Sequence, residues 1–325
     1  MSVRRLLVGA DEEGMRLDRY LAARNPGAPG ALIQRWLRTG QTRVNGGRAR
    51  GGYRLVAGEE VRLPPFQPVA REEGGVMVPE WAMRGVEELV LWRDEQVLVL
   101  NKPHGLPVHG GSGQSFGSVD VVRALLAREG RGVVGELCHR LDKETSGCLL
   151  FALDKSAARR LTGAFRLGQV DKEYLALVRG TPRPASGVIE QALVKGSVRG
   201  GGERMVVTSA AGGQSARTRY RVVESYGPFS LVAAMPETGR THQIRVHLQS
   251  LGHPVAGDDK YGDFPMNRSL RPLGLTRMFL HARRIRFTHP ATGEILEVQA
   301  PLDAVLTGVL QRLGEGSFSL KGSRP

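Results

Sequence analysis

The chain has 325 residues, of which 41% are hydrophobic and 24% are charged, a balance typical of folded globular proteins. Its length exceeds one ordinary domain, so we expect a large domain with a smaller appendage. The formal net charge of +14 indicates a polyanionic partner, because a basic surface gains free energy by releasing the counterions of phosphates. Nucleic acid is favoured over an acidic membrane surface, although a GC-rich genome would account for part of the excess arginine.

The cysteines and the N-terminus bear on the cellular compartment. Cys138 and Cys148 form no Cys-x-x-Cys pair and have no patterned histidines beside them, so the sequence supports neither a disulfide framework nor a zinc site. The apolar run at residues 6–8 is too short for a signal peptide. We therefore expect a cytoplasmic protein that uses no metal and no membrane anchor.

The first 63 residues predict two short helices and a small sheet. Apolar residues recur with helical spacing over residues 17–21 and again over residues 32–37, and Thr39-Gly40 supplies a helix stop. The next segment contains Asn45-Gly46, a pair favoured in tight hairpin turns. Strands are expected around this turn, at residues 43–46, 53–55 and 58–63.

This segment is strongly basic. Between Met1 and Arg62 there are twelve arginines and six acidic residues, a net charge of +6. The order of its elements, the run Arg16-Leu17-Asp18 and the arginine-bearing second helix resemble the S4 RNA-binding domain. The resemblance implies that this segment grips structured RNA through four arginines, Arg16, Arg35, Arg38 and Arg43. Scattered arginines also solvate an ordinary helix face, and this interpretation stays open.

A linker rich in proline and glycine is expected over residues 64–87, a catalytic domain over residues 88–315 and a flexible tail over residues 316–325. Continuous apolar runs predict strands buried on both faces at residues 89–92 and 97–100. Further strands are expected at residues 148–152, 174–178, 217–224, 229–235 and 294–298. Helices are expected at residues 119–128, 156–167, 241–251 and 302–313. The predicted fold class is α+β, with a small domain of two helices and a sheet followed by a mixed, largely antiparallel α/β domain.

The polar run at residues 139–147, HRLDKETSG, is the first candidate for chemistry. It directly precedes an apolar strand, so Asp142 is expected on a loop at the edge of a sheet, where catalytic groups are often mounted. A kinase catalytic loop is excluded, because no glycine-rich phosphate loop precedes the run and no Asp-Phe-Gly follows it. One acidic loop residue has many interpretations, so the surrounding segments must decide among them.

The run is similar to the signature of the RluA-type family of RNA pseudouridine synthases. Four further segments resemble motifs of that family and occur in the same order. They are residues 101–113 (NKPHGLPVHGGSG), 172–180 (KEYLALVRG), 238–248 (TGRTHQIRVHL) and 252–262 (GHPVAGDDKYG). Within the family, the likeness is to members that carry an S4 domain and act on several uridines of 23S ribosomal RNA. That RNA is the partner we expect.

The resemblance implies a reaction that breaks the N1–C1′ bond of uridine and forms a C5–C1′ bond, with no cofactor. Asp142 is implied as the catalytic carboxylate, acting either as nucleophile or as base for the 2′ proton. Arg245 is implied as the partner that keeps it charged, and Tyr174 as a ring that stacks on the flipped uracil. Arg140 is implied to fill the space that the base leaves. Weaker substrate contacts are expected from His139, Lys102, Thr145 and Arg240, and those of Lys102 and Arg240 are expected to be with phosphate.

Other interpretations of single residues stay open. Tyr174 in an apolar strand would often be a core aromatic, and Arg245 would be ordinary on a helix surface. Asp258-Asp259 is interpreted as a turn. The spacing of four histidines matches no common metal site, and loop or capping roles are expected for His242, His247, His253 and His281.

Three competing functions also stay open. A non-catalytic RNA-binding factor in ribosome assembly would keep the fold without the reaction, and a synthase could act on transfer RNA instead. A base-excising nucleosidase would deliver water to C1′ and release free uracil. The family resemblance further implies a monomer.

Overall fold

The computed structural model describes residues 3–66, 77–110, 115–130, 135–198, 202–208 and 212–315. The chain divides into two compact units, Met1–Gly75 and Val76–Pro325. The predicted tail at residues 316–325 and residues 67–76 of the predicted linker lie outside the described residues. Within the described parts of the chain, no helix has the length and hydrophobicity needed to cross a membrane.

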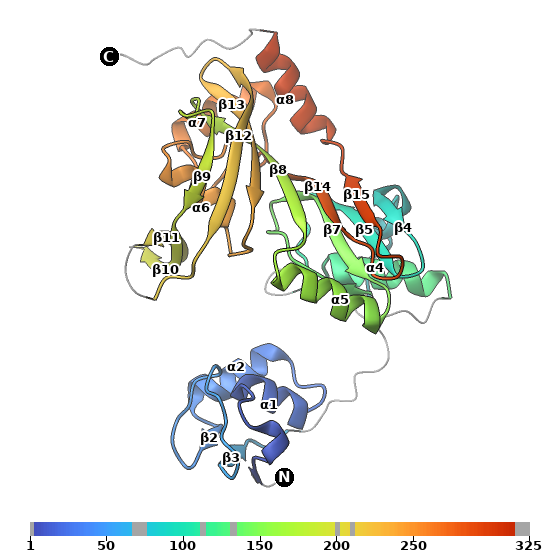
Figure 1. The fold of residues 1–325 in the computed structure, drawn as a ribbon, viewed down its shortest axis with the longest axis vertical. Coiled ribbons are helices and arrows are strands. Elements are labelled where there is room, and N and C mark those ends of the chain that lie inside the picture. The colour runs from blue at the N-terminus through green and yellow to red at the C-terminus, as the bar shows by residue number, and fades with distance from the viewer. Residues whose placement is uncertain are drawn as a thin grey trace. The chain divides into compact units, whose positions relative to one another are not determined.

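The first unit packs two helices against a small antiparallel sheet (Figure 1). Its elements are β1 (Arg4–Leu7), the 3-10 helix Ala10–Glu12, α1 (Leu17–Arg24), α2 (Gly30–Thr39), β2 (Arg43–Val44) and β3 (Glu60–Leu63). Gly40 ends α2 with a left-handed φ of 71°, which glycine adopts at little cost. Asn45 and Gly46 also have positive φ, as the predicted tight turn requires.

The core of this unit comes from the apolar faces of α1 and α2. Tyr20 and Leu21 pack with Ile33 and Trp36 of α2, so both helical spacings are confirmed. The strand predicted at residues 53–55 is wrong, because Arg54 forms only an isolated bridge and the neighbouring Leu55 turns into the core. The third strand is β1 instead, whose sequence RRLL shows no alternation that could have signalled it.

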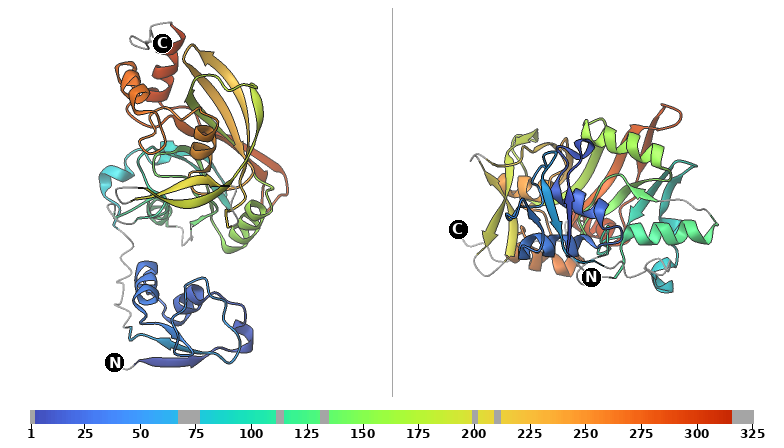
Figure 2. Two further views of the ribbon diagram at one scale, coloured as in Figure 1. Left: turned by 90° about the vertical axis from the view of Figure 1, so that its left-hand side faces the viewer. Right: turned by 90° about the horizontal axis from the view of Figure 1, so that it is seen from below.

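The second unit is built on one large mixed sheet (Figures 1 and 2). Its strands are β4 (Val90–Arg93), β5 (Val97–Lys102), β6 (Glu136–Leu137), β7 (Ser146–Ala152), β8 (Asp171–Arg179), β9 (Ser186–Glu190), β12 (Arg217–Tyr226), β13 (Phe229–Pro236), β14 (Leu280–Thr288) and β15 (Ile295–Gln299). The main path runs β4-β5-β7-β14-β8-β13-β12-β9, with β6 beside β7 and β15 beside β14. A separate hairpin pairs β10 (Ala192–Val198) with β11 (Gly202–Thr208).

The pairings of this sheet are antiparallel except for that of β7 with β14. The predicted fold class, a mixed and largely antiparallel α/β domain after a small helical one, is therefore confirmed. The parallel pair matters for the site, because it joins Ser146 and Gly147, at the end of the Asp142 loop, to His281 and Ala282.

Helices cover both faces of the sheet, as the right-hand view of Figure 2 shows for α4 and α5. The helices are α3 (Glu80–Met83), α4 (Ser118–Arg128), α5 (Lys155–Arg166), α6 (Gln243–Ser250), α7 (Phe264–Leu270) and α8 (Ala304–Gly314), with 3-10 turns at Glu87–Leu89 and Arg271–Leu273. Alternate residues of β5 face opposite layers, since Val97 packs with Leu161 of α5 and Leu98 packs with Val122 of α4. Both faces are apolar for this reason.

Part of the predicted linker is structured. Its C-terminal portion contains α3 and the turn Glu87–Leu89, and Met83 and Val86 are buried against Val121 and Leu125 of α4. These residues therefore pack as part of the second unit.

Gly147 gives a test of the parallel contact between β7 and β14. Its φ is 106°, and a Cβ atom there would lie 2.2 Å from the Ala282 carbonyl oxygen. We expect Gly147→Ala to lower the free energy of unfolding by about 3 kcal/mol, from strain and displaced backbone. Gly163→Ala in α5 is the control, because its Cβ would meet no atom within 4 Å. This substitution should raise the free energy of unfolding by about 1 kcal/mol. Urea unfolding measures both, and equal stabilities would contradict the contact.

Candidate active site

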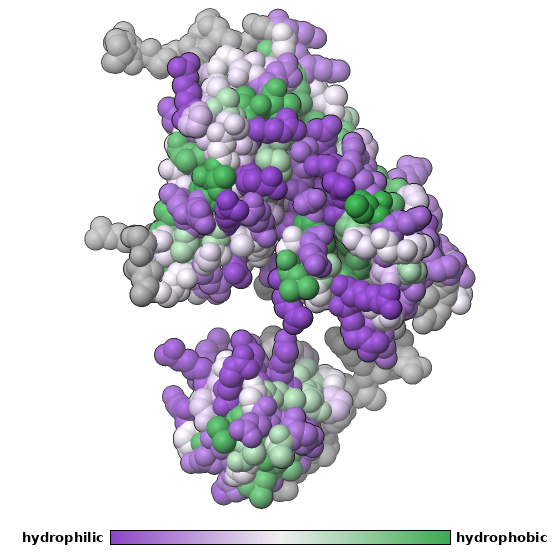
Figure 3. Space-filling model, viewed as in Figure 1, coloured by the Kyte–Doolittle hydropathy of each residue, from purple (hydrophilic) through white to green (hydrophobic). Residues whose placement is uncertain are grey.

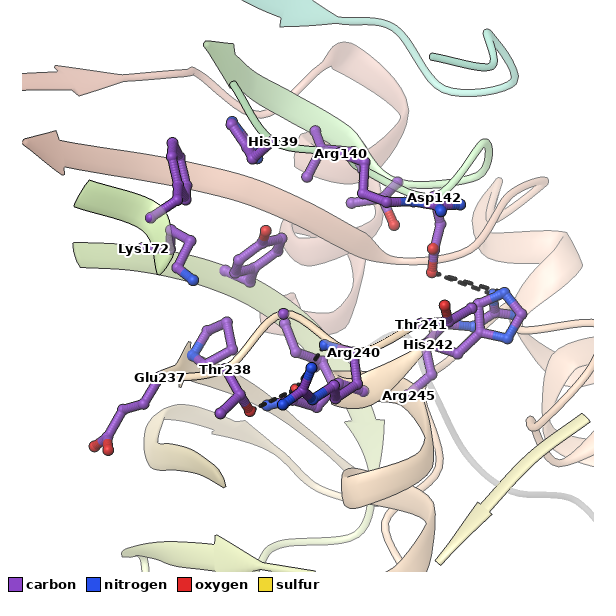
Figure 4. A pocket seen from close by; sticks show the side chains of 18 of the residues that line it. His139, Arg140, Asp142, Lys172, Glu237, Thr238, Arg240, Thr241, His242 and Arg245 are labelled. Carbon is purple, nitrogen blue, oxygen red and sulfur yellow. Dashed lines mark hydrogen bonds and ion pairs between the residues drawn. The ribbon is translucent and has the colours of Figure 1, made fainter. Parts of the chain in front are cut away.

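A cavity of about 690 Å³ lies in the second unit, within the size range of small-molecule sites (Figure 4). It is lined by residues 139–142, 145, 165–168, 172, 174, 236–245 and 280. Segments far apart in the sequence meet here, namely the loop before β7, the end of α5, β8, the end of β13 and the start of α6. Seven of the eight expected site residues of this domain line the cavity. They are His139, Arg140, Asp142, Thr145, Tyr174, Arg240 and Arg245.

Asp142 faces two basic side chains across the cavity (Figure 4). Its Oδ2 lies 3.6 Å from Nη1 of Arg245 and 4.0 Å from Nε2 of His242. The Asp142 side chain keeps 20% of its surface exposed, whereas the Arg245 side chain keeps 5%. The carboxylate is therefore opposed by a nearly buried cation and still reachable by a ligand in the cavity.

Arg245 is fixed in α6 by contacts on its other side. Its Nε donates to Oδ2 of Asp258 at 2.6 Å and its Nη2 donates to Oδ1 at 2.8 Å, a two-point ion pair. Its guanidinium carbon also lies 4.9 Å from the centre of the Tyr261 ring. Burial by itself lowers the pKa of Arg245, but Asp258 and Asp142 reverse this effect and the pKa is raised. The Nη1 group that points to Asp142 thus belongs to a fixed cation.

Asp258 is the residue that the sequence analysis missed. The backbone does turn there, as expected, but the side chain is fully buried and its Oδ1 also accepts the N–H groups of Lys260 and Tyr261. Burial by itself raises the pKa of Asp258, yet Arg245 and these N–H donors outweigh it and the pKa is lowered. No spacing rule links Asp258 to Arg245, because they lie on different elements and meet only in the folded chain.

His242 lies at the N-terminus of α6 in a left-handed conformation, with φ of 56°. Its Nδ1 lies 2.8 Å from the Tyr261 hydroxyl, which accepts the N–H of Met205. Burial lowers the pKa of His242, although the charge of Asp142 opposes this. Its Nε2 is the ring nitrogen that faces Asp142. The described residues contain no cluster of three metal-ligating side chains.

Tyr174 presents its ring to the cavity from the middle of β8. Its backbone neighbours across the sheet are Ala234 in β13 and Ala282 in β14, whose small side chains leave room beside the ring. The side chain is 8% exposed, and burial raises the pKa of Tyr174, with a further rise from the charge of Asp142. The phenol therefore stays protonated at neutral pH.

Lys102 does not line the cavity, and the phosphate contact expected of it is corrected. Its side chain is fully buried, and its ammonium donates to the carbonyl oxygens of Pro103, Leu106 and Lys143 at 2.8–3.0 Å. An ammonium has three protons, so none is left for a phosphate. Lys102 instead ties β5 to the loop that carries Asp142.

His139 lines the cavity but is engaged elsewhere. Its Nε2 accepts the N–H of Leu150 at 3.1 Å, and its ring stacks on Phe165 with centroids 4.8 Å apart. Burial lowers the pKa of His139 to about 3, so the ring is neutral at neutral pH. These contacts give His139 a role in holding the loop, and its expected contact with substrate stays a prediction.

Arg140 and Arg240 are exposed residues at the cavity, and Thr145 is buried in its wall. Arg140 also lines a second cavity of about 500 Å³, which shares residues 139–142 and His242 with the first. The Nε of Arg240 donates to the Ser215 carbonyl oxygen at 3.0 Å, and its terminal nitrogens make no hydrogen bond or ion pair with the residues that the structure describes. Both guanidinium groups are placed to meet a ligand that enters from solvent.

The four arginines expected to bind RNA lie in the first unit. Arg35 and Arg38 are exposed on α2, while Arg16 is paired with Asp18 at 2.7 Å and Arg43 donates to the Gly46 carbonyl oxygen. Their role in RNA binding stays a prediction.

Asp258 and its neighbour Asp259 form a matched pair for a test. Asp258→Asn leaves the buried guanidinium of Arg245 without a compensating charge, so the free energy of unfolding should fall by about 3 kcal/mol. Asp259 lies 3.9 Å from Arg245 but is 87% exposed, so Asp259→Asn should change stability by less than about 0.5 kcal/mol. Urea unfolding of both variants provides the comparison. Equal losses would show that Arg245 does not depend on Asp258.

Known proteins resemble this chain over nearly its whole length. The RNA pseudouridylate synthase family matches residues 96–250. Proteins named ribosomal large subunit pseudouridine synthase C are 45% identical in Haemophilus influenzae, over 97% of this chain and 96% of the relative, and 46% identical in Pasteurella multocida, over 98% and 96%. The relative with this name in Escherichia coli strain K12 is 45% identical over 96% of this chain and 97% of its own length.

Solved structures agree with the sequence matches. Human RNA pseudouridylate synthase domain containing 4 has a TM-score of 0.59 and 33% identity, covering 71% of this chain and 95% of that one. Human RNA pseudouridylate synthase domain containing 1 has a TM-score of 0.54 and 33% identity, covering 69% and 94%. The resemblance carried by the five motifs is confirmed, and the chain belongs to the RNA pseudouridylate synthase family.

Proposed function

We propose that this pseudouridine synthase isomerises several uridines of 23S ribosomal RNA, with Asp142 as the catalytic carboxylate. The observation that carries the proposal is the pairing of Asp142 with Arg245 in the cavity that also contains Tyr174. A carboxylate held charged beside a sugar is what either route of the reaction requires. The guanidinium of Arg245 supplies a fixed positive charge opposite Asp142.

The reaction conserves every atom of the nucleotide. The N1–C1′ bond breaks, the uracil turns within the cavity, C5 bonds to C1′, and the hydrogen of C5 is lost while N1 gains a proton. Asp142 either adds to C1′ and is later displaced, or removes the 2′ proton to give a glycal-like intermediate and then returns it. Both routes stay open, because both need the same carboxylate at the same place.

The other cavity residues suit a flipped nucleotide. Extrusion of the base loses stacking with its neighbours, and the ring of Tyr174 can replace part of that contact. Arg140, exposed between two cavities, can stack in the space that the base leaves and bond to RNA at the same time. His242 lies beside the carboxylate, with its Nε2 4.0 Å from Oδ2 of Asp142, and can contact a nucleotide bound there.

Three observations support ribosomal RNA as the substrate. The net charge of +14 favours a polyanion, the relatives at about 45% identity are named for the large ribosomal subunit, and the first unit has the helix order of an S4 domain with Arg35 and Arg38 exposed. We propose that the first unit grips structured RNA while the second unit performs the reaction. The reaction would then take place in the cytoplasm, and a monomer is sufficient because one chain supplies the whole site.

Asp142→Asn tests the catalytic assignment. Purified protein is incubated with an unmodified 23S transcript, and pseudouridine is mapped with a carbodiimide. We expect the rate to fall by at least about 100-fold, because the amide can neither attack C1′ nor accept a proton, while RNA affinity stays unchanged. Asp171→Asn, an exposed residue at the start of β8, is the control and should keep full activity. Equal rates of pseudouridine formation by wild type and Asp142→Asn would contradict the assignment.

The same assay separates the competing functions. A non-catalytic assembly factor would bind the transcript and leave it unmodified, and a nucleosidase would release free uracil. Modification of transfer RNA but not of 23S RNA would keep the reaction and change the proposed substrate.

A further inference from the structure

The outward face of α5 carries a stripe of basic residues. Lys155, Arg159 and Arg166 follow one another at intervals of four and seven residues, which places them on one side of the helix with Thr162 between them. All four side chains are exposed. The opposite side of α5, with Ala157 and Leu161, packs on the sheet, so this stripe is the face that the fold leaves to solvent.

The charge of this stripe is not neutralised. The sequence contains no acidic residue from Lys155 to Val170, and the described residues form no ion pair or side-chain hydrogen bond with Lys155, Arg159 or Arg166. Other exposed arginines of this unit do have partners, such as Arg179, which contacts Asp263 at 2.7 Å. Hydrophilic side chains gather over part of the surface above α5 in Figure 3.

The stripe borders a groove of about 470 Å³. Gly163 also lines this groove, and a Cβ atom there would meet no atom within 4 Å. Glu136 is the single acidic residue in its lining, against three basic ones. Arg166 lines both this groove and the active-site cavity, so the two are neighbours at this residue. A chain that leaves the cavity past Arg166 would enter the groove.

We propose that the α5 groove binds the phosphate backbone of the RNA strand next to the target uridine. The proposal rests on the proposed function, since it takes the RNA in the active site as its occupant. From Lys155 to Arg166 the helix rises about 16 Å, and a nucleic-acid strand carries a phosphate about every 3.4 Å of duplex axis, so the stripe is long enough to meet several phosphates. Such contacts position RNA without reading its sequence.

The salt dependence of RNA binding tests the groove. The full chain and the variant Lys155→Gln/Arg159→Gln are titrated with an unmodified 23S transcript over a series of KCl concentrations. Neither residue lines the active-site cavity. Each lost phosphate contact lowers the slope of log affinity against log salt by about 0.7 to 0.9, so we expect a slope reduced by about 1.5. The rate of modification at saturating RNA should not change.

The control is Arg268→Gln/Arg271→Gln, which removes two exposed arginines at α7 and the turn after it, for which the described residues provide no acidic partner. It should leave the slope as in wild type, and thermal unfolding should confirm that both variants are folded. An unchanged slope for the α5 variant would overturn the proposal, and this is also the result expected if the stripe binds an acidic protein. Failure of the proposed function would show differently, as a wild-type protein that leaves the transcript unmodified.

Discussion

The ion pair between Arg245 and Asp258 is the interaction on which the site depends. Asp258 follows Gly257, whose φ is 73° and where a Cβ atom would lie 2.2 Å from the Arg277 carbonyl oxygen, so this backbone passes very close to the chain before β14. The N–H of Ala256 donates to Leu177 in β8, and the N–H of Phe279 donates to Ala256. These hydrogen bonds fix the loop with Asp258 to the strand that carries Tyr174. The ion pair with Asp258 then fixes the position of Arg245.

The loop that carries Asp142 is held by a different set of contacts, made with β5 and β14 and the chain before β14. Ser146 ends its loop, and the Ser146 hydroxyl lies 2.8 Å from Nδ1 of His281 and accepts from Nη2 of Arg277 at 2.6 Å. Lys102 donates to the carbonyl oxygen of Lys143, directly after Asp142. The parallel pairing of β7 with β14 therefore places the loop of Asp142 at the same sheet to which the Asp258 loop, the support of Arg245, is fixed. Buried contacts therefore fix the positions of both Asp142 and Arg245, which suits the proposed reaction, in which a base turns inside the site.

The sequence predicted those parts of the fold that have a local signal. Apolar runs located β5 and β7, and the Asn45-Gly46 pair located the first hairpin turn. β14 had no such signal, because its sequence LHARRIRFT mixes charged residues with apolar ones although it lies between β7 and β8. At the site, the motifs located Asp142, Tyr174 and Arg245, while the roles of Lys102 and Asp258 depend on contacts between distant segments. Residue types alone made Lys102 resemble a phosphate ligand and Asp258 a turn residue.

In the proposed reaction, Asp142 acts opposite a cation whose position Asp258 fixes. The most direct measurement is the single-turnover rate of pseudouridine formation by Asp258→Asn at saturating 23S RNA, at a temperature where the variant is fully folded. Since Asp258 does not line the cavity, RNA affinity should be that of wild type, while the rate falls about 10- to 100-fold because Arg245 is no longer held opposite Asp142. A wild-type rate in this folded variant would contradict the account.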